Sequence, residues 1–194
     1  MTTICIIRHG ETDWNALGKV QGKTDIPLNA TGLQQARECR DILQGSNWDL
    51  IITSPLKRAK RTAEVINEGL HLPLMVMEDF IERSYGDAEG MTAEERNTAF
   101  PNKQIPNQED RESLNQRVMA GLEKIHQQVP NGNVILVAHG AVINSILAIL
   151  SEKEIGSGKT RLINGGISTV QFLEGKWGIK DFNQVGHLSK YKNM

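Results

Sequence analysis

The sequence has little cysteine, almost no net charge and no long hydrophobic run. Only two of its 194 residues are cysteines, Cys5 and Cys39, and neither has another Cys or a His at the spacing of a metal site. This pattern favours buried free thiols in a reducing compartment. The formal net charge is -1, which provides no general attraction to nucleic acid or to an anionic membrane surface. Any affinity for phosphate must therefore be local.

The N-terminal segment MTTICIIRHG lacks the features of a targeting signal. No basic leader precedes its short apolar run and no small-residue cleavage site follows it, so we expect neither a secretory signal nor a membrane span. The sequence also lacks internal repeats, heptads and low-complexity tracts. This length and composition predict one domain, residues 1–194, located in the cytoplasm.

Short apolar runs alternate with helical patterns along the chain. The runs TTICIIRHG, WDLIITSP, LPLMVM and NVILVAHG are typical of strands buried on both faces. Helices are expected over TGLQQARECRDILQG, with Thr31 and Gln34 as a capping box, and over SPLKRAKRTAEVINEG, with Ser54 as the cap. Two more are expected over residues 112–129 and after His139, and ISTVQFLEGKWGIKDF predicts a hairpin of two strands.

This order of elements predicts an α/β fold. We expect a three-layer α/β/α sandwich with a mostly parallel central sheet, to which the late hairpin adds at one edge. Residues 87–111 do not fit the alternation, because they are polar, contain Pro101 and Pro106, and predict only one short helix, with Thr92 and Glu95 as its capping box. We interpret them as an insertion over the carboxyl edge of the sheet that forms part of a substrate pocket.

Two of the predicted strands end in a histidine followed by a glycine, at His9 and at His139. Ligands of open α/β sheets bind outside the carboxyl ends of the strands, so adjacent strands would place both imidazoles in one crevice. An isolated histidine at a strand end is more often a packed, hydrogen-bonded side chain. That interpretation is kept for the three remaining histidines, which are His71, His126 and His187.

Fixed positive charge accompanies these histidines. Arg8 directly precedes His9, and Arg58 opens the helix that follows the strand ending in IITSP. The other cations of LKRAKR are interpreted as a solvated helix face. Two guanidinium groups, two imidazoles and the side-chain amide of Asn15 around one crevice would suit a dianionic tetrahedral group, most simply a phosphoryl group.

The same residues indicate a chemistry. A neutral imidazole is nucleophilic without a separate base, so His9 could attack phosphorus. The departing alcohol then needs a proton, and Glu82 is the candidate donor, because a partly apolar pocket with Phe80 and Tyr85 could raise its pKa. Three weaker candidates for this role are Glu11, Asp79 and Glu89.

Five motifs occur in order between Ile4 and about Leu150: RHGETDWN, GKTDIPLNATGLQQA, SPLKRAKRTAE, ERSYGDAEG and VAHG. Together they resemble the histidine phosphatase superfamily, also called phosphoglycerate-mutase-like proteins, and within it the broad-specificity phosphatases of the PhoE type. The resemblance implies that His9 is the phosphorylated nucleophile and that Glu82 is the acid and then the base. The implied catalytic set is Arg8, His9, Arg58, Glu82 and His139. The implied substrate-binding set is Arg8, Asn15, Gln21, Gly22, Arg58, Glu82, Arg83, Tyr85, His139 and Gly140, with no metal and no other cofactor.

Within this family the chain departs from the mutases. ERSYG resembles the ERHYG of cofactor-dependent phosphoglycerate mutases, but Ser84 stands where their histidine does. The insertion lacks the adjacent pair of arginines with which those mutases hold a second phosphate or carboxylate, and offers only scattered cations at Arg83, Lys103 and Arg111. These departures favour a phosphatase that hydrolyses small organic phosphomonoesters, with a mutase as the alternative.

Alternatives from other classes are weaker. A metal-dependent hydrolase could use His9 and His139 with Asp13 or Glu82, but Arg8 would repel a divalent cation. A non-catalytic phosphate-binding protein could share the fold. The segment GSGKT resembles part of a nucleotide phosphate-binding loop, but position 153 is Lys153 where the first glycine would stand, so a plain loop is expected.

The pocket wall should form from the surroundings of Trp14 and from the insertion. Tyr85, Met91 and Phe100, with few cations among them, predict an organic and modestly charged leaving group. The expected partner is a small phosphomonoester, without nucleic acid or membrane. The sequence leaves the oligomeric state open.

Overall fold

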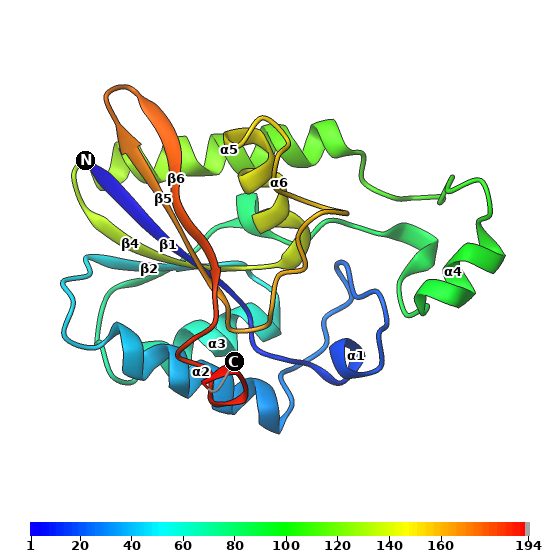
Figure 1. The fold of residues 1–194 in the computed structure, drawn as a ribbon, viewed down its shortest axis with the longest axis horizontal. Helices are drawn as coiled ribbons and strands as arrows, with labels where there is room; N and C mark the ends of the chain where they lie inside the picture. The colour runs from blue at the N-terminus through cyan, green and yellow to red at the C-terminus, as the bar shows by residue number, and fades with distance from the viewer. Residues whose placement is uncertain (193–194) are drawn as a thin grey trace.

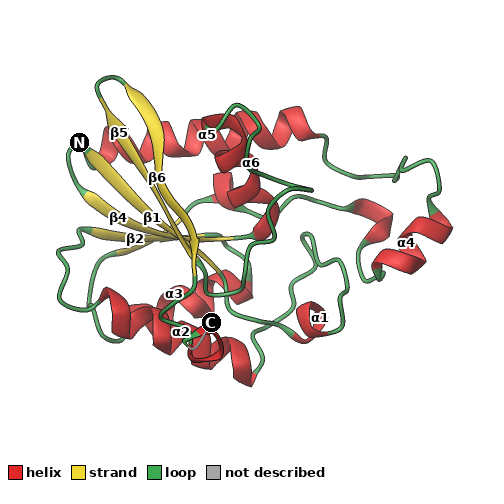
Figure 2. Ribbon diagram, viewed as in Figure 1, coloured by secondary structure: helices red, strands yellow, loops and turns green. Residues whose placement is uncertain are grey.

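A computed structural model describes residues 1–192 as a mixed six-stranded sheet with helices on both faces (Figures 1 and 2). The strand order is β3-β2-β4-β1-β5-β6. The parallel strands are β1 (Thr2–Arg8), β2 (Leu50–Thr53), β3 (Leu74–Val76) and β4 (Asn133–Ala138). The hairpin of β5 (Ile167–Leu173) and β6 (Lys176–Gln184) joins β1 in antiparallel fashion. The predicted α/β fold, with the hairpin at one edge, is confirmed.

Helices cover both faces of the sheet. Successive side chains of a strand point to opposite faces, and in the buried strands the side chains on both faces are apolar. Along β1, Ile4 and Ile6 pack with one set of helices, and Cys5 and Ile7 pack with the other. The first set is α5 (Arg111–Gln128) and α6 (Gly140–Leu150), and the second is α2 (Ala30–Leu43) and α3 (Lys57–Asn67). Both cysteines are free and buried in the second layer, as the sequence predicts.

The helix starts differ from the prediction at two places. Asn29, not Thr31, caps α2, its side chain accepting a hydrogen bond from the Gly32 amide at 2.9 Å. Ser54 does not cap α3, which begins after Leu56 without a side-chain cap. Asn and Ser are good caps wherever they occur, so sequence alone does not identify which polar residue the chain uses. Ser54 has another partner, because its hydroxyl lies 2.7 Å from Nε2 of His139.

The insertion lies beyond the carboxyl edge of the sheet, where α4 (Ala93–Ala99) stands apart from the other helices (Figure 1). Its predicted capping box of Thr92 and Glu95 is present. A bridge between Lys19 and Thr92 ties it to the segment after α1 (Asp13–Ala16). Two loops distant in sequence thus meet over the edge where the parallel strands end.

The capping correction yields a stability prediction. We expect Asn29→Ala to lower the free energy of unfolding by about 1 kcal/mol, the usual value of an N-cap side chain. The matched control is Thr31→Ala, because Thr31 is exposed inside α2 and Ala is the better helix former there. Urea denaturation of both variants measures the difference, and an equal loss in the two would contradict the assignment of the cap.

Candidate active site

The two strand-end histidines lie together. β1 and β4 are neighbours with Arg8 opposite Ala138, so His9 and His139 leave the sheet at the same level. Their ring centroids are 5.1 Å apart. The strand order thus brings the two imidazoles together, as predicted, but only His9 of the pair lines the cavity at this edge.

A cavity of about 610 Å³ opens at this edge, within the roughly 300–1,000 Å³ typical of small-molecule sites. Most of the predicted residues line it: Arg8, His9, Asn15, Gln21, Gly22, Arg58, Glu82, Tyr85 and Gly140. His139 lies behind them, fully buried, and its Nδ1 has no hydrogen-bond partner in the part of the chain that the structure describes. Arg83 does not line the cavity. Its Nε donates to the carbonyl of Glu109 at 2.8 Å and its guanidinium lies 5.4 Å from the Tyr85 ring centroid, so it supports the wall from outside.

The ring of His9 has a defined proton position. Its Nδ1 lies 2.7 Å from the carbonyl oxygen of Gly10, and a carbonyl can only accept, so Nδ1 carries the hydrogen and Nε2 keeps a free lone pair. Burial lowers the pKa of His9 well below its ordinary value, and the positive charges of Arg58 and Arg8 lower it further. The imidazole is therefore neutral and nucleophilic at neutral pH.

Two buried arginines flank this ring. Arg58 donates to the carbonyls of Thr24 at 2.9 Å and Gly22 at 2.6 Å, while Arg8 donates to the carbonyl of Leu162. Among residues 1–192, the buried Nε of each arginine has no hydrogen-bond partner. Backbone carbonyls hold the guanidinium groups without neutralising them, so the charge and the unpartnered donors remain for an anion.

Gly22 is required for this arrangement by its backbone. Its φ is +54°, and a Cβ would lie 2.1 Å from the carboxylate of Glu89. Any other residue would disturb the turn that aims its carbonyl at Arg58.

Glu82 is a buried carboxyl at the cavity. Burial raises its pKa, against the opposing effects of the amides of Arg83 and Ala141, at 2.9 and 3.2 Å, and of the charge on Arg58. The expected direction of the shift is confirmed. The three weaker candidates for the proton donor do not line the cavity: Glu11 accepts from Asn29, Asp79 pairs with Lys124, and Glu89 accepts from Lys23, Thr24 and Tyr85.

Sequence reasoning missed one positioning residue, Asn164. Its Nδ2 donates to the carbonyl of His9 at 3.0 Å and to Oδ1 of Asn15 at 3.2 Å. The backbone amide of Thr12 also donates to Oδ1 of Asn15, which leaves the Nδ2 donors of Asn15 for the cavity. No local pattern marks Asn164, because its role depends on the pairing of β1 with β5.

The pocket wall also differs from expectation. Met91 and Phe100 do not line the cavity, and the wall contains four cations that were not assigned to it, Lys19, Arg96, Lys159 and Arg161. GSGKT is a loop, as expected, but residues 157–162 and Asn164 belong to the wall. The prediction of a pocket with few cations is therefore wrong, because three segments that are distant in sequence bring their charges together: the loop after α1, helix α4, and the loop between α6 and β5.

Two further properties bear on the class of protein. Within residues 1–192, no three His, Cys, Asp or Glu side chains are grouped so that they could hold a metal ion. None of the helices described is long and apolar enough to cross a membrane.

A neutral buried histidine between two arginines, at the carboxyl edge of a mostly parallel sheet, defines a site for phosphoryl groups. Residues 4–185 match the model of the histidine phosphatase superfamily (branch 1), so the chain belongs to that family and is a phosphatase. It is 54% identical over 98% of its length to a Bacillus subtilis protein described as the uncharacterized phosphatase PhoE, covering 99% of that protein.

More distant relatives carry a substrate in their names. The chain is 32% identical to the metal-independent phosphoserine phosphatase of Arabidopsis thaliana, over 97% of this chain and 84% of that one. A solved mutant of the phosphoserine phosphatase of Entamoeba histolytica, in complex with phosphoserine, superposes with a TM-score of 0.86 at 34% identity. The alignment covers 97% of this chain and 100% of the other.

The hydrogen bonds of Asn164 yield a prediction for the reaction. We expect Asn164→Ala to lower kcat/KM for p-nitrophenyl phosphate by about tenfold, since a lost hydrogen bond of about 1–1.5 kcal/mol has that effect. Because Asn164 acts partly through Asn15, the double variant with Asn15→Ala should lose less than the product of the two single losses. Fully multiplicative losses would show that Asn164 does not orient Asn15.

Proposed function

We propose that the protein hydrolyses small phosphomonoesters through a phosphohistidine on His9, with Glu82 as the general acid and then the general base. The observation that carries the proposal is the free Nε2 lone pair of a neutral His9 beside two buried, unpartnered arginine donors. Positively charged donors of this kind suit the non-bridging oxygens of a phosphoryl group.

In the first step, Nε2 of His9 attacks phosphorus and the bond from phosphorus to the ester oxygen breaks. The electron pair leaves with that oxygen, and Glu82, whose pKa burial raises, gives it a proton. Arg8 and Arg58 stabilise the charge on the transferred group, and His139, whose ring centroid lies 5.1 Å from that of His9, assists them. The imidazole of His9 becomes cationic as its Nδ1 hydrogen bond to Gly10 strengthens.

In the second step, the carboxylate of Glu82 takes a proton from water. The water oxygen bonds to phosphorus, the bond from phosphorus to Nε2 breaks, and its electron pair returns to the imidazole. Phosphate leaves with both residues restored. No step needs a metal ion, because the arginines supply the positive charge, and the Arabidopsis relative named as metal-independent supports this reading.

The substrate range and location are also proposals. Phosphoserine is the substrate named for two relatives, which supports a small, polar phosphomonoester as the substrate here. The buried free thiols of Cys5 and Cys39 support a reducing compartment, the cytoplasm.

A phosphoglycerate mutase reaction is the second candidate, favoured by the basic wall of the cavity. It would use the same phosphohistidine and pass the group to a second substrate oxygen. Ser84 opposes it, because its hydroxyl donates to the carbonyl of Asn107 and cannot replace the mutase histidine as an imidazole. Release of phosphate from 3-phosphoglycerate, rather than its isomerisation, would decide for the phosphatase.

The covalent intermediate can be trapped. Quenching in base during turnover of a labelled phosphomonoester should leave acid-labile, base-stable phosphate on the peptide that contains Arg8 and His9. His126→Ala is the matched control, because His126 bonds to Thr2 away from the cavity and its loss should leave the label in place. Label on an aspartate, or none while turnover continues, would overturn the assignment of His9.

The role of Glu82 can be tested with leaving groups of different basicity. Glu82→Gln cannot donate a proton at neutral pH, so phosphorylation of His9 by alkyl phosphates should slow by roughly 100-fold. Nitrophenolate leaves readily without a proton, so p-nitrophenyl phosphate should be affected far less in the same step. Single-turnover kinetics isolates that step from hydrolysis of the phosphohistidine.

The matched control for this experiment is Glu78→Gln, since Glu78 is exposed and does not line the cavity. It should change neither rate. Equal losses with both leaving groups in Glu82→Gln would mean that Glu82 only shapes the pocket.

A further inference from the structure

Glu82 lies in a short segment outside the helices and strands. It follows the 3₁₀ helix η1 (Glu78–Phe80) and precedes the insertion. In the proposed reaction its carboxyl must meet first the ester oxygen and then a water molecule, which requires a fixed position. The contacts that hold the backbone of this segment come from α5 and from the C-terminal end of the insertion.

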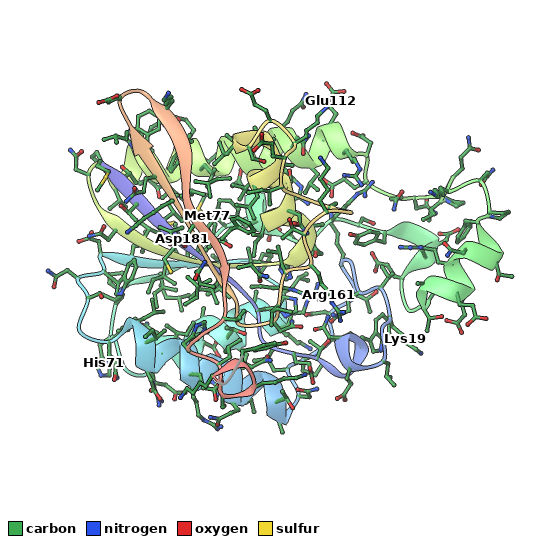
Figure 3. The ribbon with its side chains drawn as sticks, viewed as in Figure 1. Lys19, His71, Met77, Glu112, Arg161 and Asp181 are labelled. Atoms are coloured by element: carbon green, nitrogen blue, oxygen red, sulfur yellow. The ribbon has the colours of Figure 1, made fainter. Side chains whose placement is uncertain are left out.

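Helix α5 lies close to η1 because of Gly121. A Cβ at this position would lie 2.7 Å from Cζ of Phe80 and 2.9 Å from Cβ of Asp79, so any other residue would push the helix and η1 apart. Figure 3 labels Glu112 in the first turn of α5, at the end of the helix where the chain returns from the insertion. Arg117 is one helical turn before Gly121 and therefore faces the segment after η1.

The guanidinium group of Arg117 makes four hydrogen bonds at this place. Nη1 donates to the carbonyl oxygens of Asp79, at 2.9 Å, and of Ile81, at 2.7 Å. Nε and Nη2 donate to the two carboxylate oxygens of Glu109, at 2.7 and 2.9 Å. The carbonyl of Ile81 belongs to the same planar peptide unit as the amide nitrogen of Glu82. The bond from Nη1 therefore orients the backbone that enters Glu82.

Glu109 holds the chain on the other side of Glu82. Its amide donates to the carbonyl of Ser84 at 3.0 Å, and its carbonyl accepts from Nε of Arg83 at 2.8 Å. The amide of Arg83 in turn donates to Oε1 of Glu82 at 2.9 Å. Arg117 and Glu109 together thus fix the backbone before and after the carboxyl group.

The ion pair of Arg117 and Glu109 is bidentate and mostly buried, with side chains that are 20% and 13% exposed. Burial by itself would raise the pKa of Glu109, but the hydrogen bonds and the charge of Arg117 outweigh burial and the pKa falls. The carboxylate therefore stays ionised at neutral pH. Only a planar guanidinium fits these contacts, because an ammonium group cannot bind two carboxylate oxygens and two carbonyls in fixed directions.

Arg117 differs from the arginines of the phosphoryl site. It does not line the cavity, and the carboxylate of Glu109 offsets its charge. Burial is the largest cause of the pKa shift of Glu82, and the charges of Arg58 and Arg8 oppose it. The contacts of Arg117 therefore act on Glu82 through the backbone and not through the charge of the guanidinium group.

We propose that Arg117 and Glu109 are positioning residues that hold the carboxyl of Glu82 where it can give a proton to the leaving oxygen. This inference rests on the proposed function, in which Glu82 is the general acid. A displacement of about 1 Å is enough to impair a catalytic group. Loss of the ion pair should therefore slow proton delivery and leave the attack by His9 intact.

Single-turnover phosphorylation of His9 with two leaving groups tests this role. Arg117→Lys keeps the charge and loses the planar group, so phosphorylation by glycerol 2-phosphate should slow by about tenfold, part of the roughly 100-fold that general acid catalysis contributes. The rate with p-nitrophenyl phosphate should change far less, because nitrophenolate leaves without a proton. Equal slowing with both substrates would mean that the pair only maintains the fold, and would overturn the inference.

A double variant separates positioning from an independent effect. If Arg117 acts through Glu82, then Arg117→Lys added to Glu82→Gln should slow glycerol 2-phosphate no further than Glu82→Gln does alone. Multiplicative losses would contradict the proposal. The matched control is Lys124→Gln, because Lys124 also reaches from α5 to this segment, at 2.6 Å from the Asp79 carboxylate, and contacts neither Glu109 nor the carbonyls. It should change neither rate.

A second variant keeps the test decisive if Arg117→Lys does not fold, as judged by circular dichroism. Glu109→Gln removes the charge of the carboxylate and keeps its size, so the guanidinium group of Arg117 loses its bidentate partner. The same selective loss with glycerol 2-phosphate is expected from this variant. Its absence in a folded Glu109→Gln protein would overturn the inference.

Failure of this inference can be separated from failure of the proposed function. If Glu82→Gln slows only the alkyl phosphate while Arg117→Lys slows neither substrate, Glu82 is the acid and the positioning role is wrong. If Glu82→Gln slows both substrates equally, the proposed role of Glu82 fails, and the inference fails with it.

Discussion

The buried positive charge of Arg8 and Arg58 beside His9 is the constraint on which the rest of the site depends. Burial lowers the pKa of the His9 imidazole, and the charges of Arg58 and Arg8 lower it further, because guanidinium groups stay charged when buried. The same charges that suit a phosphoryl group therefore favour the unprotonated form of His9, the proposed nucleophile. One electrostatic arrangement supports both binding and attack.

Burying two guanidinium groups requires partners for their donors, and the loops provide them. The carbonyls of Gly22, Thr24 and Leu162 satisfy some of the N–H groups without carrying a negative charge that would neutralise them. Two loops that are distant in sequence, one with Gly22 and Thr24 and the other with Leu162, therefore converge on the carboxyl edge of the sheet. The need for these partners also explains the left-handed conformation of Gly22, whose carbonyl must face Arg58.

Burial and electrostatic interactions have opposite effects on the pKa of the Glu82 carboxyl group. Nearby arginines and two backbone amides favour its carboxylate, yet burial favours its neutral form more strongly, and its pKa rises. A carboxyl balanced in this way can lose and regain a proton within one catalytic cycle.

Much of the fold could be predicted from the sequence, because it rests on local patterns. The buried runs, the helical periodicity and the late hairpin each depend on neighbouring residues, and they identify the layers correctly. The N-cap residues of the helices were harder to predict. Asn29 and Thr31 are both competent caps two residues apart, and only the backbone geometry selects Asn29.

The sequence by itself determined the chemistry of the site through His9, Arg8 and the histidine and glycine that end β4. A strand end projects its side chains to a known edge of a parallel sheet, so a short motif is enough to place them there. Only the tertiary structure decided what Asn164 and Arg83 contact and that Arg161 lines the cavity. The partners of Asn164 and Arg83 are distant in sequence, and no local pattern encodes either these hydrogen bonds or the gathering of positive charge at the cavity.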